Sequence, residues 1–143
     1  MLIILTFVEV LTHTAIVFAL AASTFIVFAT PASRSATPRR LIGGHIVGIL
    51  CGLVCYYIFN GGLLQDAAES YDIVIWFAYA LSVALSLFIM TITNTEHPPA
   101  AATAMGIVAN GFTWQVVVFV VLFAVFLSLA KRLLKPWLKD LIN

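Results

Sequence analysis

Long apolar segments separated by short polar breaks run along the whole chain. Three of these segments each reach the roughly 20 apolar residues that an α-helix needs to cross a bilayer. They are residues 41–59, 72–93 and 113–134. A fourth apolar stretch, residues 1–30, is longer than one span needs and is interrupted by Glu9 and His13. None of the segments alternates polar and apolar residues as the strands of a membrane barrel do. The pattern therefore predicts an all-α fold, a polytopic membrane helical bundle.

The composition supports this class. The chain has 143 residues, of which 63% are hydrophobic and 9% are charged, and its mean hydropathy is +1.12. A soluble domain would carry about 25% charged residues. We expect a single transmembrane domain over residues 1–143, and the net charge of +1 gives no indication of nucleic-acid binding. The N-terminus shows no basic leader or cleavage site, so we expect a multi-pass protein of a prokaryotic cytoplasmic (inner) membrane.

The charges also predict how the chain crosses the membrane. All seven basic residues lie in the loop 31–40 or at the C-terminus, whereas the loop 60–72 carries three acidic residues and no basic one. The positive-inside rule therefore places loop 31–40 and the C-terminus in the cytoplasm. Two cytoplasmic points require an even number of crossings, yet only three long segments lie between them. We expect residues 98–112 to supply the fourth crossing as a short, broken helix. In the alternative, 1–30 is one span, 94–112 is a cytoplasmic loop and the basic tail lies outside.

An internal similarity suggests a repeat. Residues 21–29 (AASTFIVFA) align with residues 100–108 (AAATAMGIV), which places Thr24 opposite Thr103. If each half contains a span, a short helix and a long helix, the halves 1–60 and 71–135 are inverted copies whose short helices meet near the midplane. The bundle would then have four long or near-long spans plus one or two short or broken helices.

Small residues recur at helical spacing in residues 41–59. Gly44, Gly48 and Gly52 form a stripe on which another helix can approach closely. The sequence leaves open whether this stripe is a homo-oligomer contact or a seam inside the bundle. Cys51 and Cys55 lie one helical turn apart in the same segment, and we interpret them as packing residues.

The stretch TNTEHPPAAATAMG, residues 93–106, places polar groups between two apolar segments. Proline is common at the first position of a helix, and the amide groups at a helix N-terminus attract anions. The alanines that follow would let a small anion approach the backbone, and a neighbouring carboxylate would favour a charged imidazole. The candidate substrate-binding residues are Glu96, His97, Pro98, Pro99, Ala100 and Thr103, with Ser23 and Thr24 at the equivalent place in the first half and His45 beside Gly44.

Structural interpretations compete with each of these assignments. The two prolines would equally end one helix and start another, with Glu96 and His97 at the surface. For His45 we favour a hydrogen bond between helices over a contact to substrate. The basic loop Arg34–Arg40 is first a topology signal and second a vestibule for anions. Glu9 and His13 are left undecided between a surface position and a cavity.

The sequence gives no sign of catalysis. Nucleophile, metal-ligand and carboxylate pairs at useful spacings are missing, as are phosphate-loop and dinucleotide motifs. We therefore expect no enzyme activity, no cofactor and no metal.

The motifs EHPPAAATA and FATPASRSATPRRLIGGHIVG resemble those of the HPP family of small integral membrane proteins. The first contains the His-Pro-Pro of the family name, and the second leads through a Pro-Arg loop into Gly-Gly-His. The resemblance implies a membrane-embedded transport protein, since chloroplast relatives in plants are described as nitrite transporters. It also implies a protein with four spans, whereas the charge pattern predicts a further short crossing by residues 98–112. We expect a carrier or channel for a small anion, nitrite or similar. The alternative is a membrane assembly or regulatory module without transport activity.

Overall fold

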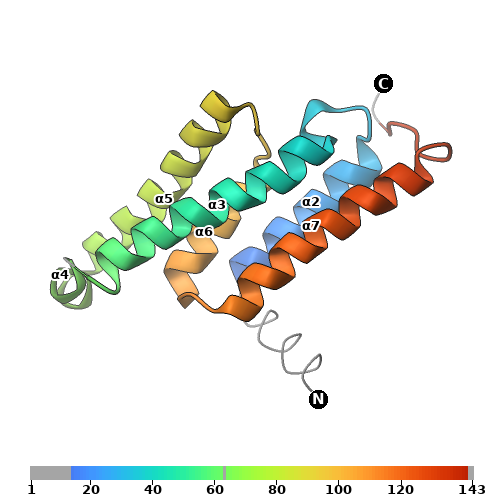
Figure 1. Cartoon of the computed structure of the whole chain (residues 1–143). Helices are drawn as coiled ribbons and strands as arrows, with labels where there is room; N and C mark the ends of the chain where they lie inside the picture. The colour runs from blue at the N-terminus through green and yellow to red at the C-terminus, as the bar shows by residue number, and fades with distance from the viewer. Residues whose placement is uncertain (1–13, 63, 142–143) are drawn as a thin grey trace, which may run out of the picture.

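The computed structural model describes residues 14–62 and 64–141, and this part of the chain is helical without strands. Its elements are α2 (Thr14–Ala29), the short 3₁₀ helix η1 (Arg34–Ala36), α3 (Pro38–Phe59), α4 (Gln65–Ser70), α5 (Asp72–Thr93), α6 (Pro99–Asn110) and α7 (Trp114–Leu134) (Figure 1). Three of them, α3, α5 and α7, are long and apolar enough to cross a membrane, and α2 is a shorter apolar helix of 16 residues. The predicted all-α membrane bundle is confirmed, with three long helices in the described part of the chain.

The helix ends gather at two opposite ends of the bundle. Arg39 at the start of α3 donates a hydrogen bond to the Thr93 carbonyl at the end of α5, at 3.2 Å. The amide of Leu141, beyond α7, donates to the Ala29 carbonyl at the end of α2, at 2.9 Å. The basic loop and the C-terminal tail therefore lie at one end of the bundle, which we call the basic end. Its opposite end carries α4 and the link between α6 and α7 (Figure 1).

The short helix predicted for residues 98–112 is present as α6. It begins near the basic end, where α5 stops, and leads to the opposite end, where α7 starts (Figure 1). Its 12 residues rise about 18 Å, at ~1.5 Å per residue. The alternative in which residues 94–112 form a loop outside the bundle is wrong, because α6 lies in the middle of the bundle against α2, α3 and α5.

The glycine stripe of α3 is the reason α6 can lie so deep. A Cβ atom on Gly44 would come 2.6 Å from the Cβ of His97, and one on Gly48 would collide with the carbonyl of Ala100. Gly52 stands in the same way against Ala104, where a Cβ would come 2.7 Å from the carbonyl oxygen. The stripe is therefore a seam inside the bundle, and the homo-oligomer contact through these glycines is wrong, since α6 of the same chain covers them. Cys51 and Cys55 are buried free thiols, as a packing role requires.

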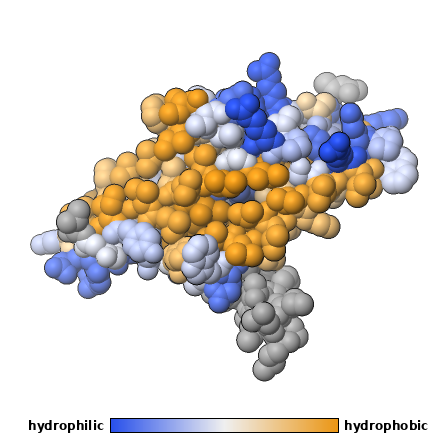
Figure 2. Space-filling model, viewed as in Figure 1, coloured by the Kyte–Doolittle hydropathy of each residue, from blue (hydrophilic) through white to orange (hydrophobic). Residues whose placement is uncertain are grey.

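Apolar side chains that do not face the bundle point outward. Hydrophobic residues cover the middle of the visible face, while hydrophilic residues gather at its ends (Figure 2). Large exposed side chains on α5 and α7 include Trp76, Phe77, Phe88, Phe126 and Leu133. An apolar surface of this extent requires lipid around it, since a soluble protein rarely exposes such a patch.

The inverted repeat stays a prediction. The helices α2 and α6 run in opposite directions, and so do α3 and α7 (Figure 1), as inverted halves 1–60 and 71–135 would require. However, α2 continues through residue 21 without the break that the alignment with α6 suggested. The first member of the first half, together with Glu9 and His13, falls in residues 1–13, outside the described residues.

Candidate functional site

Two imidazole rings meet inside the bundle. His45 comes from the second turn of α3 and His97 from the segment just before α6; both side chains are fully buried, and the ring centroids are 5.4 Å apart. The hydroxyl of Ser23, in the middle of α2, lies between them. Its Oγ is 3.0 Å from His45 Nε2 and 2.8 Å from His97 Nε2. Three segments that are distant in sequence thus converge on one hydroxyl group.

Hydrogen bonds continue from both rings. His45 Nδ1 lies 3.0 Å from Thr103 Oγ1 of α6, and His97 Nδ1 lies 2.9 Å from the carbonyl oxygen of Ser35 in η1. We call the series Thr103, His45, Ser23, His97 and the Ser35 carbonyl the buried polar chain. All four of its side chains are 0% exposed. Polar groups buried in a membrane bundle are expensive and are kept for function by default.

The acceptor at one end decides where the protons lie. A carbonyl oxygen can only accept, so His97 Nδ1 carries a hydrogen and its Nε2, in the neutral ring, must accept one. Ser23 therefore donates to His97 Nε2, and its oxygen accepts from His45 Nε2–H. His45 Nδ1 then accepts from the Thr103 hydroxyl. Every member of the chain is paired with no net charge, and all the hydrogen bonds point from Thr103 towards Ser35.

A second arrangement holds one more proton. The Ser23 hydroxyl also lies 2.8 Å from the Ala19 carbonyl. If His97 gains a proton on Nε2, it donates to Ser23, whose own hydrogen turns to Ala19. The serine oxygen then accepts from both rings, which uses its two lone pairs. The buried polar chain can thus gain or lose a proton when the Ser23 hydroxyl rotates, and every polar group keeps a hydrogen-bond partner in both states.

The buried polar chain lies closer to the basic end of the bundle than to the opposite end. His45 is seven residues into α3, which places it roughly 10 Å from the helix start at ~1.5 Å per residue. Ser35 is only half-buried, so the outer end of the chain reaches the loop at the basic end. Thr103, at the inner end of the buried polar chain, lies on the side of α6 that faces α3. A Cβ atom added to Gly48 of α3 would be 3.6 Å from the Thr103 side chain.

The amide donors expected at the start of α6 are already occupied. Pro98 and Pro99 have no N–H group, the amide of Ala100 donates to the His97 carbonyl at 2.9 Å, and that of Ala101 donates to the Pro98 carbonyl at 3.1 Å. Ala100 is buried against the glycine stripe, whereas Pro98 is exposed and Pro99 half-buried. The start of α6 therefore positions His97 and presents no row of free amides.

Two further predicted site residues, Glu96 and Thr24, do not belong to the buried polar chain. Glu96 forms an ion pair with Arg40 at 3.2 Å, at the surface of the basic end. Thr24 donates to the Leu20 carbonyl of its own helix at 2.8 Å. The interpretation of His97 as a surface residue is wrong, and the hydrogen bond between helices expected of His45 is present.

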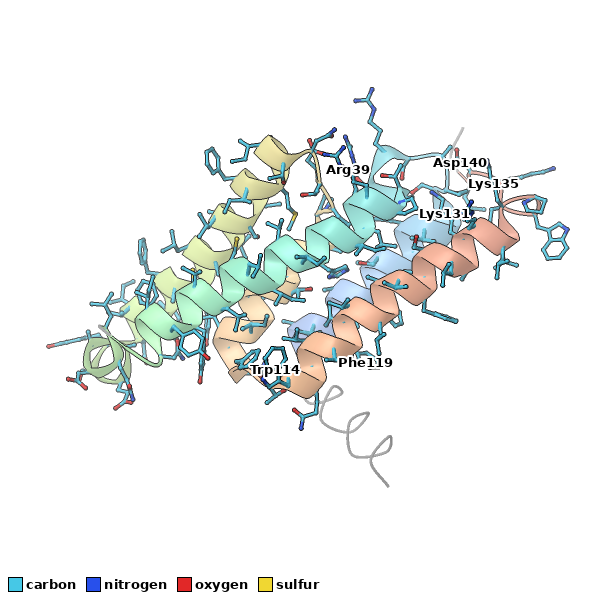
Figure 3. All side chains as sticks on the ribbon, in the orientation of Figure 1. Arg39, Trp114, Phe119, Lys131, Lys135 and Asp140 are labelled. Atoms are coloured by element: carbon cyan, nitrogen blue, oxygen red, sulfur yellow. The ribbon has the colours of Figure 1, made fainter. Side chains whose placement is uncertain are left out.

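Sequence reasoning missed the role of η1. Its two consecutive carbonyl groups bind different parts of the molecule, Ser35 accepting from His97 and Ala36 accepting from Lys131 Nζ of α7 at 2.6 Å. A backbone acceptor leaves no signal in the sequence. Lys131 also lines a pocket of about 460 Å³ at the basic end, where Lys131, Lys135 and Asp140 lie together (Figure 3). The bases that line it come from α7 and the tail, and not from the loop Arg34–Arg40 expected as a vestibule.

Comparisons with known proteins agree with the resemblance seen in the motifs. Two transmembrane proteins of Dictyostelium discoideum are similar to this chain, with 39% and 36% identity over 85 residues. The similar region covers 59% of this chain and 27% and 24% of the two relatives, so it spans about a quarter of their length. No solved structure matches. The family described as HPP, transmembrane region, matches residues 1–136, nearly the whole chain, and the protein therefore belongs to this family of membrane proteins.

Proposed function

We propose that the protein moves a small monovalent anion, nitrite or a similar ion, across the bilayer together with a proton held by the buried polar chain. The observation that carries this proposal is the pair of fully buried imidazoles joined by one serine hydroxyl. Two titratable rings in series, with paired states for zero or one extra proton, suit proton transfer.

The extra proton would join His97 at Nε2, because its Nδ1 already donates to the Ser35 carbonyl. A protonated His97 places positive charge in an apolar interior, where attraction to an anion is much stronger than in water. The anion and the proton would then cross as an electrically neutral pair. Gly44, Gly48 and Ala100 pack beside the rings without large side chains, and their close contact leaves no open space there.

The transport step requires movement, because small residues close the seam between α3 and α6 around the chain. Gly44 and Gly48 meet only backbone and small groups at the start of α6, so the movement would begin there, whereas Ile107 and Val108 pack against large side chains of α3 farther along. Such motion of a short helix against a long one would open the rings to one side at a time, as in transporters with broken helices.

The membrane assignment is part of the same proposal. We place the protein in a prokaryotic inner membrane with its basic end in the cytoplasm, by the positive-inside rule. The site residues of this proposal are His97, His45, Ser23 and Thr103. The protein would act without a cofactor and without catalysing a reaction.

Nitrite uptake into proteoliposomes tests the function. Nitrous acid crosses lipid unaided, so protein-free liposomes of the same lipid set the background. The wild-type protein should exceed that background, and His97→Gln, which keeps a hydrogen-bonding amide but cannot carry the proton, should fall to it. Thr24→Val is the matched control, since that hydroxyl bonds only within α2, and its uptake should equal that of the wild type.

Two outcomes would reject the proposal. Uptake by the wild-type protein that does not exceed the protein-free background excludes transport of this anion. A His97→Gln variant with full uptake but lower stability or altered size in detergent would favour the alternative, an assembly or regulatory module in which the histidines only hold helices together.

A further inference from the structure

The pocket at the basic end has a role separate from the buried polar chain. It has a volume of about 460 Å³, within the range of roughly 300–1,000 Å³ that holds small organic ligands. Its walls are the end of α7, the start of the C-terminal tail and the loop between α2 and α3. The lining residues are Pro31, Ala32, Pro38, Ser128, Lys131, Arg132, Lys135, Leu138 and Asp140.

The polar lining is built for an anion. It presents three cations, Lys131, Arg132 and Lys135, against one carboxylate. Among residues 14–62 and 64–141, Arg40 forms a salt bridge with Glu96. None of the three lining cations forms a salt bridge within these residues. The Lys131 ammonium group donates one N–H to the Ala36 carbonyl, and its other two N–H groups remain for a ligand.

The carboxylate in the lining has a different task. Asp140 Oδ1 accepts a hydrogen bond from the amide of Ala32 at 3.0 Å, and the next residue, Leu141, bonds back to α2. These contacts fold the tail over the pocket and give it a fourth wall. The carboxylate is therefore part of the framework. Its charge also acts on Lys131, but three cations face this one carboxylate, so the cations are the recognition groups.

The position of the pocket fits the level of lipid headgroups. Lys131 and Arg132 lie in the last turn of α7, a helix long enough to span the bilayer. Trp137, just beyond, is 78% exposed, as is usual for aromatic side chains at the membrane–water interface. Basic residues at this level interact with anionic lipids.

We propose that this pocket binds a phosphate group, either of an anionic lipid headgroup or of a free phosphate compound. An arginine fork and two ammonium groups match several phosphate oxygens at once, whereas an ion as small as nitrite would reach only part of the lining. The proposal does not depend on the proposed transport. It is reached through a different set of residues and would hold for a membrane module without transport activity.

The test uses the whole protein in bilayers of neutral phosphatidylcholine. Thermal unfolding is followed with inorganic phosphate or glycerol phosphate added, and separately with phosphatidylglycerol mixed into the bilayer. The double variant Arg132→Gln/Lys135→Gln removes two exposed cations from the lining. Lys139→Gln is the control, with the loss of one positive charge close in sequence but outside the pocket.

We expect a phosphate-bearing ligand to raise the unfolding temperature of the wild type and of Lys139→Gln. The double variant should require at least roughly tenfold more ligand, because it loses the charge-assisted hydrogen bonds of two cations. Stabilisation by the lipid alone would identify a headgroup site, and stabilisation by the soluble compounds would identify a free phosphate site. No stabilisation by any of them, or an equal loss in Lys139→Gln, would overturn the proposal.

Discussion

Replacement of Ser23 by alanine tests the buried polar chain at its centre. The substitution removes one hydroxyl group that pairs with both rings, at 3.0 Å for His45 and 2.8 Å for His97. Alanine keeps the helix and creates only a small void. What is lost is the partner of two buried imidazole nitrogens, one a donor and the other an acceptor.

The expected cost follows from those two nitrogens. A buried polar group left without a partner costs about 1–3 kcal/mol, and values for interhelical hydrogen bonds in membrane proteins lie at or below the low end of that range. We therefore expect Ser23→Ala to lower the free energy of unfolding by about 2 kcal/mol. The neighbouring hydroxyl of Thr24 bonds only to Leu20 of its own helix. Thr24→Val should cost less than about 0.5 kcal/mol, the usual size for a site without special contacts.

Reversible unfolding in mixed detergent micelles measures this difference for both variants. Nitrogen NMR of isotope-labelled histidines supplies a second readout, because the hydrogen bonds fix opposite tautomers in the neutral chain. His45 should carry its proton on Nε2 and His97 on Nδ1, and Ser23→Ala should shift the Nε2 resonances of both. Equal stability of Ser23→Ala and Thr24→Val, or the same tautomer at both rings, would refute the reasoning.

Two further predictions concern the bundle. Gly48→Ala should destabilise the protein by at least about 1–3 kcal/mol, because its Cβ would collide with the Ala100 carbonyl of α6 in the resting bundle. Gly61→Ala should change the unfolding midpoint little, because the atom nearest to the added Cβ is 3.5 Å away. Equal effects of the two substitutions would contradict the close seam between α3 and α6. After replacement of the two native cysteines, Ser33→Cys and Lys139→Cys should react with a membrane-impermeant thiol reagent from one side of the bilayer and Glu69→Cys from the other. Labelling of Lys139→Cys from the same side as Glu69→Cys would contradict the path of α6.

Much of the fold could be predicted from local properties of the sequence. The long apolar runs specify α3, α5 and α7 because only a helix pairs its own backbone within lipid. The short helix α6 followed from charge counting and from His-Pro-Pro, because prolines start a helix and basic loops share a side. The glycine stripe predicted a close approach, but its partner could have been this chain or another, and only the three-dimensional structure shows that it is α6.

The candidate site was predicted only in part. His45, His97, Ser23 and Thr103 were all named from the sequence, as polar groups in apolar surroundings. Their mutual hydrogen bonds depend on how four segments pack, which no single segment specifies. The expectation of free amides at the start of α6 failed, because the first turn closes its own hydrogen bonds at Ala100 and Ala101.

The central claim is that the buried polar chain carries a proton together with a small anion. Nitrite uptake and internal pH, recorded in the same proteoliposomes against a protein-free background, test it most directly. The account predicts uptake with simultaneous internal acidification, both above the background for the wild type and both reduced to it for His97→Gln. Uptake above background without additional proton movement, or unchanged coupling in His97→Gln, would contradict it.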